Sequence, residues 1–116
     1  MSRNRRIALA LLAPLLVLAL AGCPKQTTVA DIKNDPGRYR DKEVALRGNV
    51  TQSFGALDKG AYELDDGTGR IWVLVEKTGV PRQGARVEVV GRVIAGATFL
   101  GRDYGTSLRE KKHRTV

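Results

Sequence analysis

The sequence predicts an all-β domain, folded as a small closed barrel of five short strands. Apolar and polar residues alternate with a period of two in several short segments after residue 41. Glycine-rich turns separate these segments, and only one short segment has a helical pattern. Gly48 and Gly91 stand at inward-facing positions of long strands, where a small barrel has to bend sharply. These glycines favour a closed barrel over an open sandwich.

The first 22 residues have the composition of a secretory signal peptide. Residues 1–6 carry three arginines and no acid, and residues 7–20 form an uncharged apolar run. Small Ala21 and Gly22 then precede Cys23, the only cysteine. Such a run, if helical, would rise about 21 Å, which is short of the roughly 30 Å hydrocarbon core of a bilayer. We therefore expect a signal peptide rather than a membrane span.

The end of this segment, Leu20 to Cys23, resembles the lipobox of bacterial lipoproteins. The resemblance implies cleavage between Gly22 and Cys23, and diacylation of the Cys23 sulfur, which anchors the protein to a membrane. An ordinary secretory signal followed by a chance cysteine is the alternative. The expected location is the cell envelope, on the periplasmic or extracellular side. Pro24 is not the aspartate that commonly marks inner-membrane retention in enterobacteria, so the outer membrane is preferred in a host with two membranes.

The mature chain divides into a lipidated tether at residues 23–27, a domain at 28–110 and a basic tail at 111–116. Its 94 residues suffice for one small core, and its 17 lysines and arginines against 12 acids give a net charge of +5. Much of the excess lies near the C-terminus. There we expect a solvated, frayed end, with contact to anionic lipid head groups or other envelope polyanions as the alternative.

The domain begins with one or two helical turns over residues 28–33, with Thr28 as the N-cap, and Pro36 stops them. Residues 52–60 are expected to be a loop, and the turn at residues 66–69 joins two strands in a hairpin. The five expected strands are residues 42–51, 61–65, 70–75, 86–93 and 104–109. Alternation places these side chains in the core: Val44, Leu46, Val50, Leu64, Ile71, Val73, Val87 and Val89.

Three blocks of the sequence resemble a bacterial OB-fold, and together they cover roughly half of the mature chain. They are residues 42–50 with Val-x-x-x-Gly, 62–73 with Asp-Gly-Thr-Gly, and 84–93 with Val-x-Val-x-Gly. The pattern is similar to that of small periplasmic OB-fold proteins, which share the short helix and the secretion signal. The anticodon-binding domains of tRNA synthetases are similar too, but they usually have a basic residue where Asp65 stands and a glutamine where Trp72 stands. The resemblance implies a five-stranded OB-fold barrel preceded by a short helix.

The outer face of the hairpin strands is the candidate ligand site, because OB-folds usually bind there. Alternation places Trp72 and Arg70 on this face. Trp72 either stacks on a ligand or packs on Phe54 in the 52–60 loop, and we favour the packing role. Arg47 and Arg70 belong to a set of outward arginines that form a basic stripe or, as we favour, are screened by neighbouring acids. The candidate ligand-binding residues are Trp72, Arg70, Arg47 and Phe54.

The sequence carries no pattern typical of an enzyme or a metal site. His113 is the only histidine, and Asp65 and Asp66 point to opposite faces of a strand, so neither a metal cluster nor a cooperating acid–base pair is expected. We predict a non-catalytic, lipid-anchored binding module of the cell envelope without a cofactor, with a protein, glycan or small-molecule partner. The alternative is a membrane-tethered protein that binds single-stranded nucleic acid. The oligomeric state is left open.

Overall fold

The computed structural model describes residues 24–116 apart from 57–58, 78 and 100, so the predicted signal peptide and Cys23 lie outside the described residues. No helix in the described part is long and apolar enough to cross a membrane. The elements in chain order are β1 (Lys25–Gln26), α2 (Val29–Asn34), α3 (Pro36–Tyr39), β2 (Glu43–Ala56), β3 (Lys59–Asp65), β4 (Arg70–Val75), β5 (Arg86–Ile94), β6 (Thr98–Phe99), β7 (Arg102–Asp103) and β8 (Ser107–Thr115).

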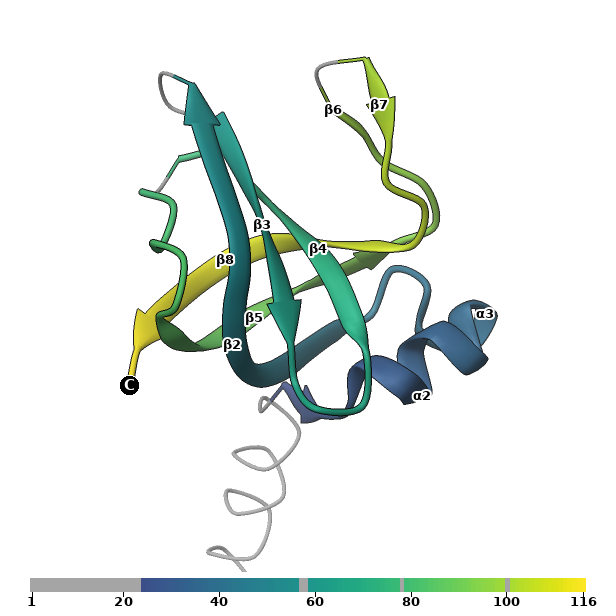
Figure 1. The fold of residues 1–116 in the computed structure, drawn as a ribbon. Coiled ribbons are helices and arrows are strands. Elements are labelled where there is room, and N and C mark those ends of the chain that lie inside the picture. The colour runs from purple at the N-terminus through teal and green to yellow at the C-terminus, as the bar shows by residue number, and fades with distance from the viewer. Residues whose placement is uncertain (1–23, 57–58, 78, 100) are drawn as a thin grey trace, which may run out of the picture.

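Five strands close into a barrel in the spatial order β2-β3-β4-β8-β5, and β5 returns to pair with β2 (Figure 1). Closure is achieved by the long strand β2, whose residues 43–49 pair with β5 and whose residues 49–56 pair with β3. The pairing of β4 with β8 is parallel, and the other pairings around the barrel are antiparallel. The two helices lie at one end of the barrel, and the β6–β7 hairpin projects away from the barrel, apart from the helices (Figure 1). The predicted closed five-stranded barrel is confirmed.

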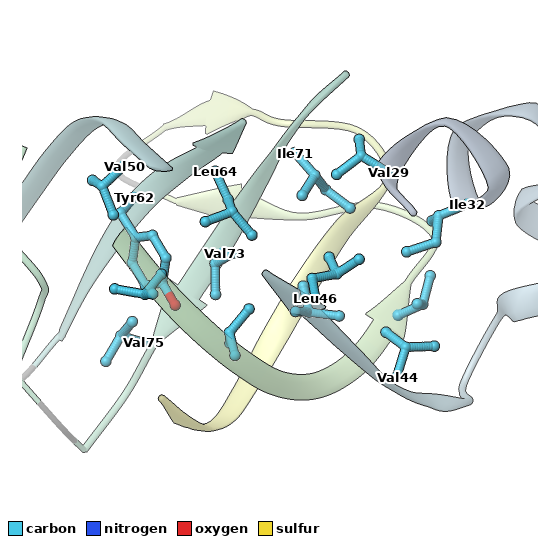
Figure 2. Packing of buried hydrophobic residues seen from close by; sticks show 14 of the residues in the cluster. Val29, Ile32, Val44, Leu46, Val50, Tyr62, Leu64, Ile71, Val73 and Val75 are labelled. Atoms are coloured by element: carbon cyan, nitrogen blue, oxygen red, sulfur yellow. The ribbon is translucent and has the colours of Figure 1, made fainter. Parts of the chain in front are cut away.

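The core fills the barrel from one end to the other. All eight side chains that the alternation placed inside are buried, and they are joined by Tyr62, Val75, Val93 and Leu108. Val29 and Ile32 of α2 add to the cluster near Ile71, Leu46 and Val44, as Figure 2 shows. The short helix therefore closes one end of the barrel with apolar side chains.

Two glycines allow neighbouring strands to approach closely. A Cβ atom on Gly48 would lie 2.5 Å from the carbonyl oxygen of Asp65, and a Cβ on Gly91 would lie 2.5 Å from that of Arg109. Real Cβ atoms do not come so near to backbone oxygens, so only glycine fits without a shift of a strand. Both glycines are buried, as their inward-facing positions predicted, and the structure shows that they are points of close contact between strands.

The expected loop at residues 52–60 is wrong, because β2 continues to Ala56 and β3 begins at Lys59. A bulge between Val50 and Gln52 shifts the alternation by one residue, so the pattern breaks although the backbone pairing continues. The tether also differs from the expectation. Lys25 and Gln26 pair in parallel with β2, and their polar, exposed side chains conceal the strand.

The expected frayed tail is wrong as well, because β8 runs from Ser107 to Thr115 and pairs with β5 along its length. Its lysine and arginine side chains are exposed, and its backbone pairing with β5 holds this part in place. At the other end, α2 ends at Asn34 as predicted, but helical structure resumes at Pro36. It is the first residue of α3, where a proline loses no helical hydrogen bond, and the side chain of Asp35 caps this helix.

Candidate functional site

The outer face of the β3–β4 hairpin has the orientation that the alternation predicted. Glu63 stands opposite Trp72, and Asp65 stands opposite Arg70. The side chains between them on each strand, such as Leu64 and Ile71, are fully buried. The register of the hairpin is therefore confirmed, and Trp72 lies half-buried on the outside of the barrel.

Three aromatic rings from separate parts of the chain meet on this face, and we call them the aromatic cluster: Phe54, Trp72 and Tyr104. The ring centroid of Trp72 lies 4.9 Å from that of Tyr104 and 5.8 Å from that of Phe54. The Phe54 and Tyr104 centroids are 6.4 Å apart. Tilted rings at these separations attract one another. The predicted contact between Trp72 and Phe54 is confirmed, and all three side chains remain half-buried rather than buried.

Tyr104 and Arg102 were missed because sequence reasoning placed Tyr104 at the start of the last strand. Both residues belong to the excursion between β5 and β8 that contains the β6–β7 hairpin. The guanidinium carbon of Arg102 lies 5.2 Å from the centroid of the Tyr104 ring, within the range of a cation–π contact. The backbone N–H of Tyr104 donates to the carbonyl of Ala97 at 2.8 Å, which fixes the loop. The length of the segment between the last two barrel strands could have pointed to these residues. OB-folds use the loop at this place, between their fourth and fifth strands, to bind ligands.

Arg70 lies on the same face as Trp72, and its charge is balanced. Its Nε lies 3.3 Å from Oδ2 of Asp65, and its Nη1 lies 3.7 Å from Oε1 of Glu63. The same Glu63 oxygen accepts a hydrogen bond of 2.7 Å from the hydroxyl of Thr51. The predicted screening of Arg70 by neighbouring acids is confirmed. The β3–β4 face therefore offers aromatic surface with little net charge.

Arg47 does not belong to the aromatic cluster. It lies on the part of β2 that pairs with β5, and its guanidinium forms an ion pair with Glu88 of β5. The four predicted site residues thus separate into two places. Phe54, Trp72 and Arg70 share the β3–β4 side of the barrel, whereas Arg47 belongs to the β5 side.

The hairpin turn at residues 66–69 has a structural role that the sequence did not indicate. Oδ2 of Asp66 accepts a hydrogen bond of 2.8 Å from the backbone N–H of Val29, and Oγ1 of Thr68 accepts one of 3.1 Å from the N–H of Ala30. Partial burial alone would raise the pKa of Asp66, but its hydrogen bonds from Thr68, Val29 and Gly69 outweigh this effect and lower it. The turn is therefore an N-terminal cap for α2.

His113 lies in the barrel wall and not in a tail. Its Nδ1 is 2.7 Å from Oε1 of Glu110, and the same oxygen accepts a 2.7 Å hydrogen bond from the hydroxyl of Tyr62. The Glu110 side chain is only 2% exposed. Burial, followed by the hydrogen bond and the charge of Glu110, raises the pKa of Tyr62 well above its ordinary value. Within the described residues, no group of three metal-ligating side chains is gathered at one place.

Comparisons with known proteins bear on the fold. No family model and no curated protein matches the chain. A putative aspartyl-tRNA synthetase from Leishmania major Friedlin is similar in structure, with a TM-score of 0.61, 18% identity, and coverage of 81% of this chain and 21% of that one. Asparaginyl-tRNA synthetase from Pyrococcus horikoshii has a TM-score of 0.58 and 19% identity, with coverage of 81% and 23%.

A third similar structure is the OBody AM3L09 bound to hen egg-white lysozyme. It has a TM-score of 0.54 and 18% identity, and the match covers 68% of this chain and 85% of that one. The match spans less than a quarter of the length of the two synthetases. At such identities the likeness concerns the fold alone. Together with the closed five-stranded barrel, it shows that the domain is an OB-fold.

Proposed function

We propose that this protein is a non-catalytic binding module of the cell envelope that takes its ligand on the aromatic cluster. The observation that carries the proposal is the position of the cluster. Phe54 of β2, Trp72 of β4 and Tyr104, which lies between β7 and β8, meet on the outer β3–β4 face. OB-folds bind ligands on this face and with the adjoining loops. A half-buried tryptophan that two other rings hold in place is a preorganised stacking surface.

The chemistry of the face favours a ligand with a flat or ring-shaped apolar surface. Trp72 supplies the platform, and Arg102, on the Tyr104 ring, adds one cation at the edge. Arg70 contributes little free charge because Asp65 and Glu63 hold it. The first candidate ligand is therefore a peptide side chain, a sugar ring or a small cyclic molecule of the envelope.

Single-stranded nucleic acid is the second candidate. Base stacking on Trp72, together with the charge of Arg102, favours it, and two of the proteins with a similar fold are named as tRNA synthetases. The acids Glu63 and Asp65 on the same face oppose a phosphate backbone. The two candidates differ in their dependence on salt, since phosphate contacts make affinity fall steeply as salt rises.

The fluorescence of Trp72 provides the test, because the chain has no second tryptophan. A protein of residues 24–116 is suitable for this titration, because every buried apolar residue of the described core lies between Val29 and Leu108. Candidate oligosaccharides, peptides and a single-stranded oligonucleotide are titrated at low and high NaCl. A stacked ligand should quench the emission. For a nucleobase, Trp72→Ala should weaken binding by about 1–3 kcal/mol.

The matched control is Leu74→Ala, which truncates another half-buried outward side chain of β4 outside the aromatic cluster. It should leave binding unchanged. If Trp72→Ala lowers stability but an identified ligand still binds with full affinity, Trp72 is a packing residue and the site lies elsewhere. Steep salt dependence would favour the nucleic-acid candidate, and shallow dependence would favour a neutral ligand.

The lipid anchor is a separate part of the proposal and rests on the lipobox-like sequence at residues 20–23. Two or more acyl chains hold a protein stably on a membrane, where a single chain gives only reversible binding. Cys23→Ser should therefore produce an unprocessed or released protein in cell fractionation. Unchanged membrane association together with unchanged acyl labelling would refute the anchor, without bearing on the aromatic cluster.

A further inference from the structure

The positive charge of the domain is concentrated on one side of the barrel, away from the aromatic cluster. We call this side the basic face: it is the outer surface of residues 43–49 of β2 together with β5 and β8. Its cations are Arg47 from β2, Arg86 and Arg92 from β5, and the four lysines and arginines of β8 at residues 109, 111, 112 and 114. All seven are exposed.

Strand register explains why these side chains share one face. Arg92 of β5 stands opposite Glu43 of β2 and opposite Arg109 of β8. The next pair along β5 and β8, Val93 and Leu108, is buried in the core. A register shift between Val90 and Gly91 adds one residue to β8. A bulge of this kind lets Lys111 and Lys112 both reach the surface in succession. The β8 strand therefore shows four cations outward and keeps Glu110 and His113 inside.

The basic face accounts for the whole net charge of residues 24–116. These residues contain 17 cations and 12 acids, and the face holds seven of the cations but only two of the acids, Glu43 and Glu88. The other charged side chains of residues 24–116 therefore number ten of each sign. Both acids are already engaged. Glu43 lies 3.5 Å from Nζ of Lys111, and Glu88 pairs with Arg47 and, at 2.6 Å, with Arg114.

Three of the cations on this face, Arg86, Arg92 and Lys112, have no carboxylate partner in the described part of the chain. Arg92 donates instead to the backbone carbonyl of Asp41 at 3.3 Å. A broad surface with net positive charge and free cations fits a surface with fixed negative charge. The other outward side chains on the three strands include Ala45, Asn49, Val90 and Ile94, none of which is aromatic. Because the face lacks an aromatic platform, its chemistry suits head groups rather than unstacked bases.

The N-terminal end of the domain lies beside this face. Lys25 and Gln26 of β1 pair with Val44 and Ala45, which on their other side pair with Gly91 and Val90 of β5. Two residues of chain reach at most about 7 Å, so a membrane anchor on Cys23 would hold this sheet next to the bilayer. This step alone rests on the proposed lipid anchor. We propose that the basic face docks on the anionic head groups of a phospholipid membrane.

The test uses residues 24–116, which carry no acyl group, so its result is independent of the lipid anchor and of the aromatic cluster. Binding is measured by co-sedimentation with vesicles of phosphatidylcholine alone, or mixed two to one with phosphatidylglycerol. We expect binding to the mixed vesicles only, and weaker binding as NaCl is raised. Arg86→Gln with Lys112→Gln should weaken it about 30-fold, since each cation near an anionic surface contributes about fivefold.

The control variant, Lys33→Gln with Lys59→Gln, removes two exposed lysines from α2 and β3 and should leave vesicle binding unchanged. Equal binding to both kinds of vesicle would overturn the proposal. So would a double variant of Arg86 and Lys112 that binds like the parent. If a single-stranded oligonucleotide binds more tightly than the mixed vesicles, and this double variant loses that binding while Trp72→Ala keeps it, the basic face is a nucleic-acid surface instead.

Discussion

Oδ2 of Asp66 and the backbone N–H of Val29 lie 2.8 Å apart, although 37 residues separate them in the chain. Val29 is the first residue of α2, where a helix has backbone N–H groups without a partner inside the helix. Three side chains accept hydrogen bonds from these groups. Thr28 accepts from the N–H of Asp31, Thr68 accepts from the N–H of Ala30, and Asp66 accepts from the N–H of Val29. The hairpin turn and α2 are therefore joined by hydrogen bonds, in addition to the apolar contact of Val29 and Ile32 with the core.

Loss of the Asp66 carboxylate should loosen this junction. Asp66→Ala is expected to lower the free energy of unfolding by about 1–2 kcal/mol, the usual effect of removing a helix cap. Urea unfolding followed by circular dichroism measures the change. Asp31→Ala is the control, because this exposed residue is in the first turn of the same helix and its carboxylate accepts no hydrogen bond from the described residues. Equal losses in the two variants would contradict the capping role.

The same carboxylate predicts a dependence of stability on pH. Hydrogen bonds lower the pKa of Asp66 below its ordinary value of 3.8 in the folded state. Its contribution to stability is therefore fully present above that value and is lost as the pH falls through the folded-state pKa. The difference in unfolding free energy between the parent and Asp66→Asn should shrink toward zero in strong acid. A difference that stays constant over this range would show that the charge of Asp66 is irrelevant.

The strand alternation was sufficient to predict the barrel core but not its polar junctions. Val44, Ile71 and Val87 could be placed inside from period-two spacing alone, because each side of a strand faces one environment. The capping bond between Asp66 and Val29 joins residues far apart in sequence, and no local pattern encodes it. The strand residues after Gln52 were missed because a bulge resets the alternation.

The close contact at Gly91 predicts a position where even a methyl group is excluded. Gly91→Ala should lower the free energy of unfolding by about 1–3 kcal/mol or more, since the new Cβ would lie 2.5 Å from the Arg109 carbonyl oxygen. Gly96→Ala is the control. A Cβ at Gly96 meets no atom within 4 Å, so stability should stay the same or rise slightly. If the two variants have the same stability, β5 and β8 are not as close as the structure places them.

The hydrogen bond from the Tyr62 hydroxyl to Glu110 predicts that removing this hydroxyl destabilises the fold. Tyr62→Phe should lower the free energy of unfolding by about 1–3 kcal/mol, because the buried Glu110 carboxylate loses a 2.7 Å donor. Tyr39→Phe serves as the comparison. Its hydroxyl accepts a longer bond of 3.3 Å from Thr27, so the loss should be smaller. A loss for Tyr62→Phe no larger than that for Tyr39→Phe would mean that Glu110 does not depend on this donor.

Two of the three rings of the aromatic cluster could be predicted from the sequence. Trp72 was assigned to the outer face because its neighbours in β4 are apolar and alternate with it. Phe54 was placed beside it because the expected loop at residues 52–60 would cover this part of the barrel. Tyr104 could not be found in this way. It reaches Trp72 because the chain leaves the barrel after β5 and returns before β8, and alternation says nothing about the path of such an excursion.

The packing of Tyr104 on Trp72 can be tested without any ligand. Tyr104→Ala removes the ring whose centroid is 4.9 Å from that of the indole, so Trp72 becomes more exposed to water. The emission maximum of Trp72 should shift to longer wavelength, and stability should fall by about 0.5–1.5 kcal/mol from the lost aromatic contact. Arg102→Ala is the matched control, because it removes a side chain of the same excursion whose ring contact is with Tyr104. It should leave the emission maximum in place. If Tyr104→Ala leaves the emission unchanged as well, the excursion does not pack on Trp72 in solution, and the stacking surface consists of Trp72 and Phe54 alone.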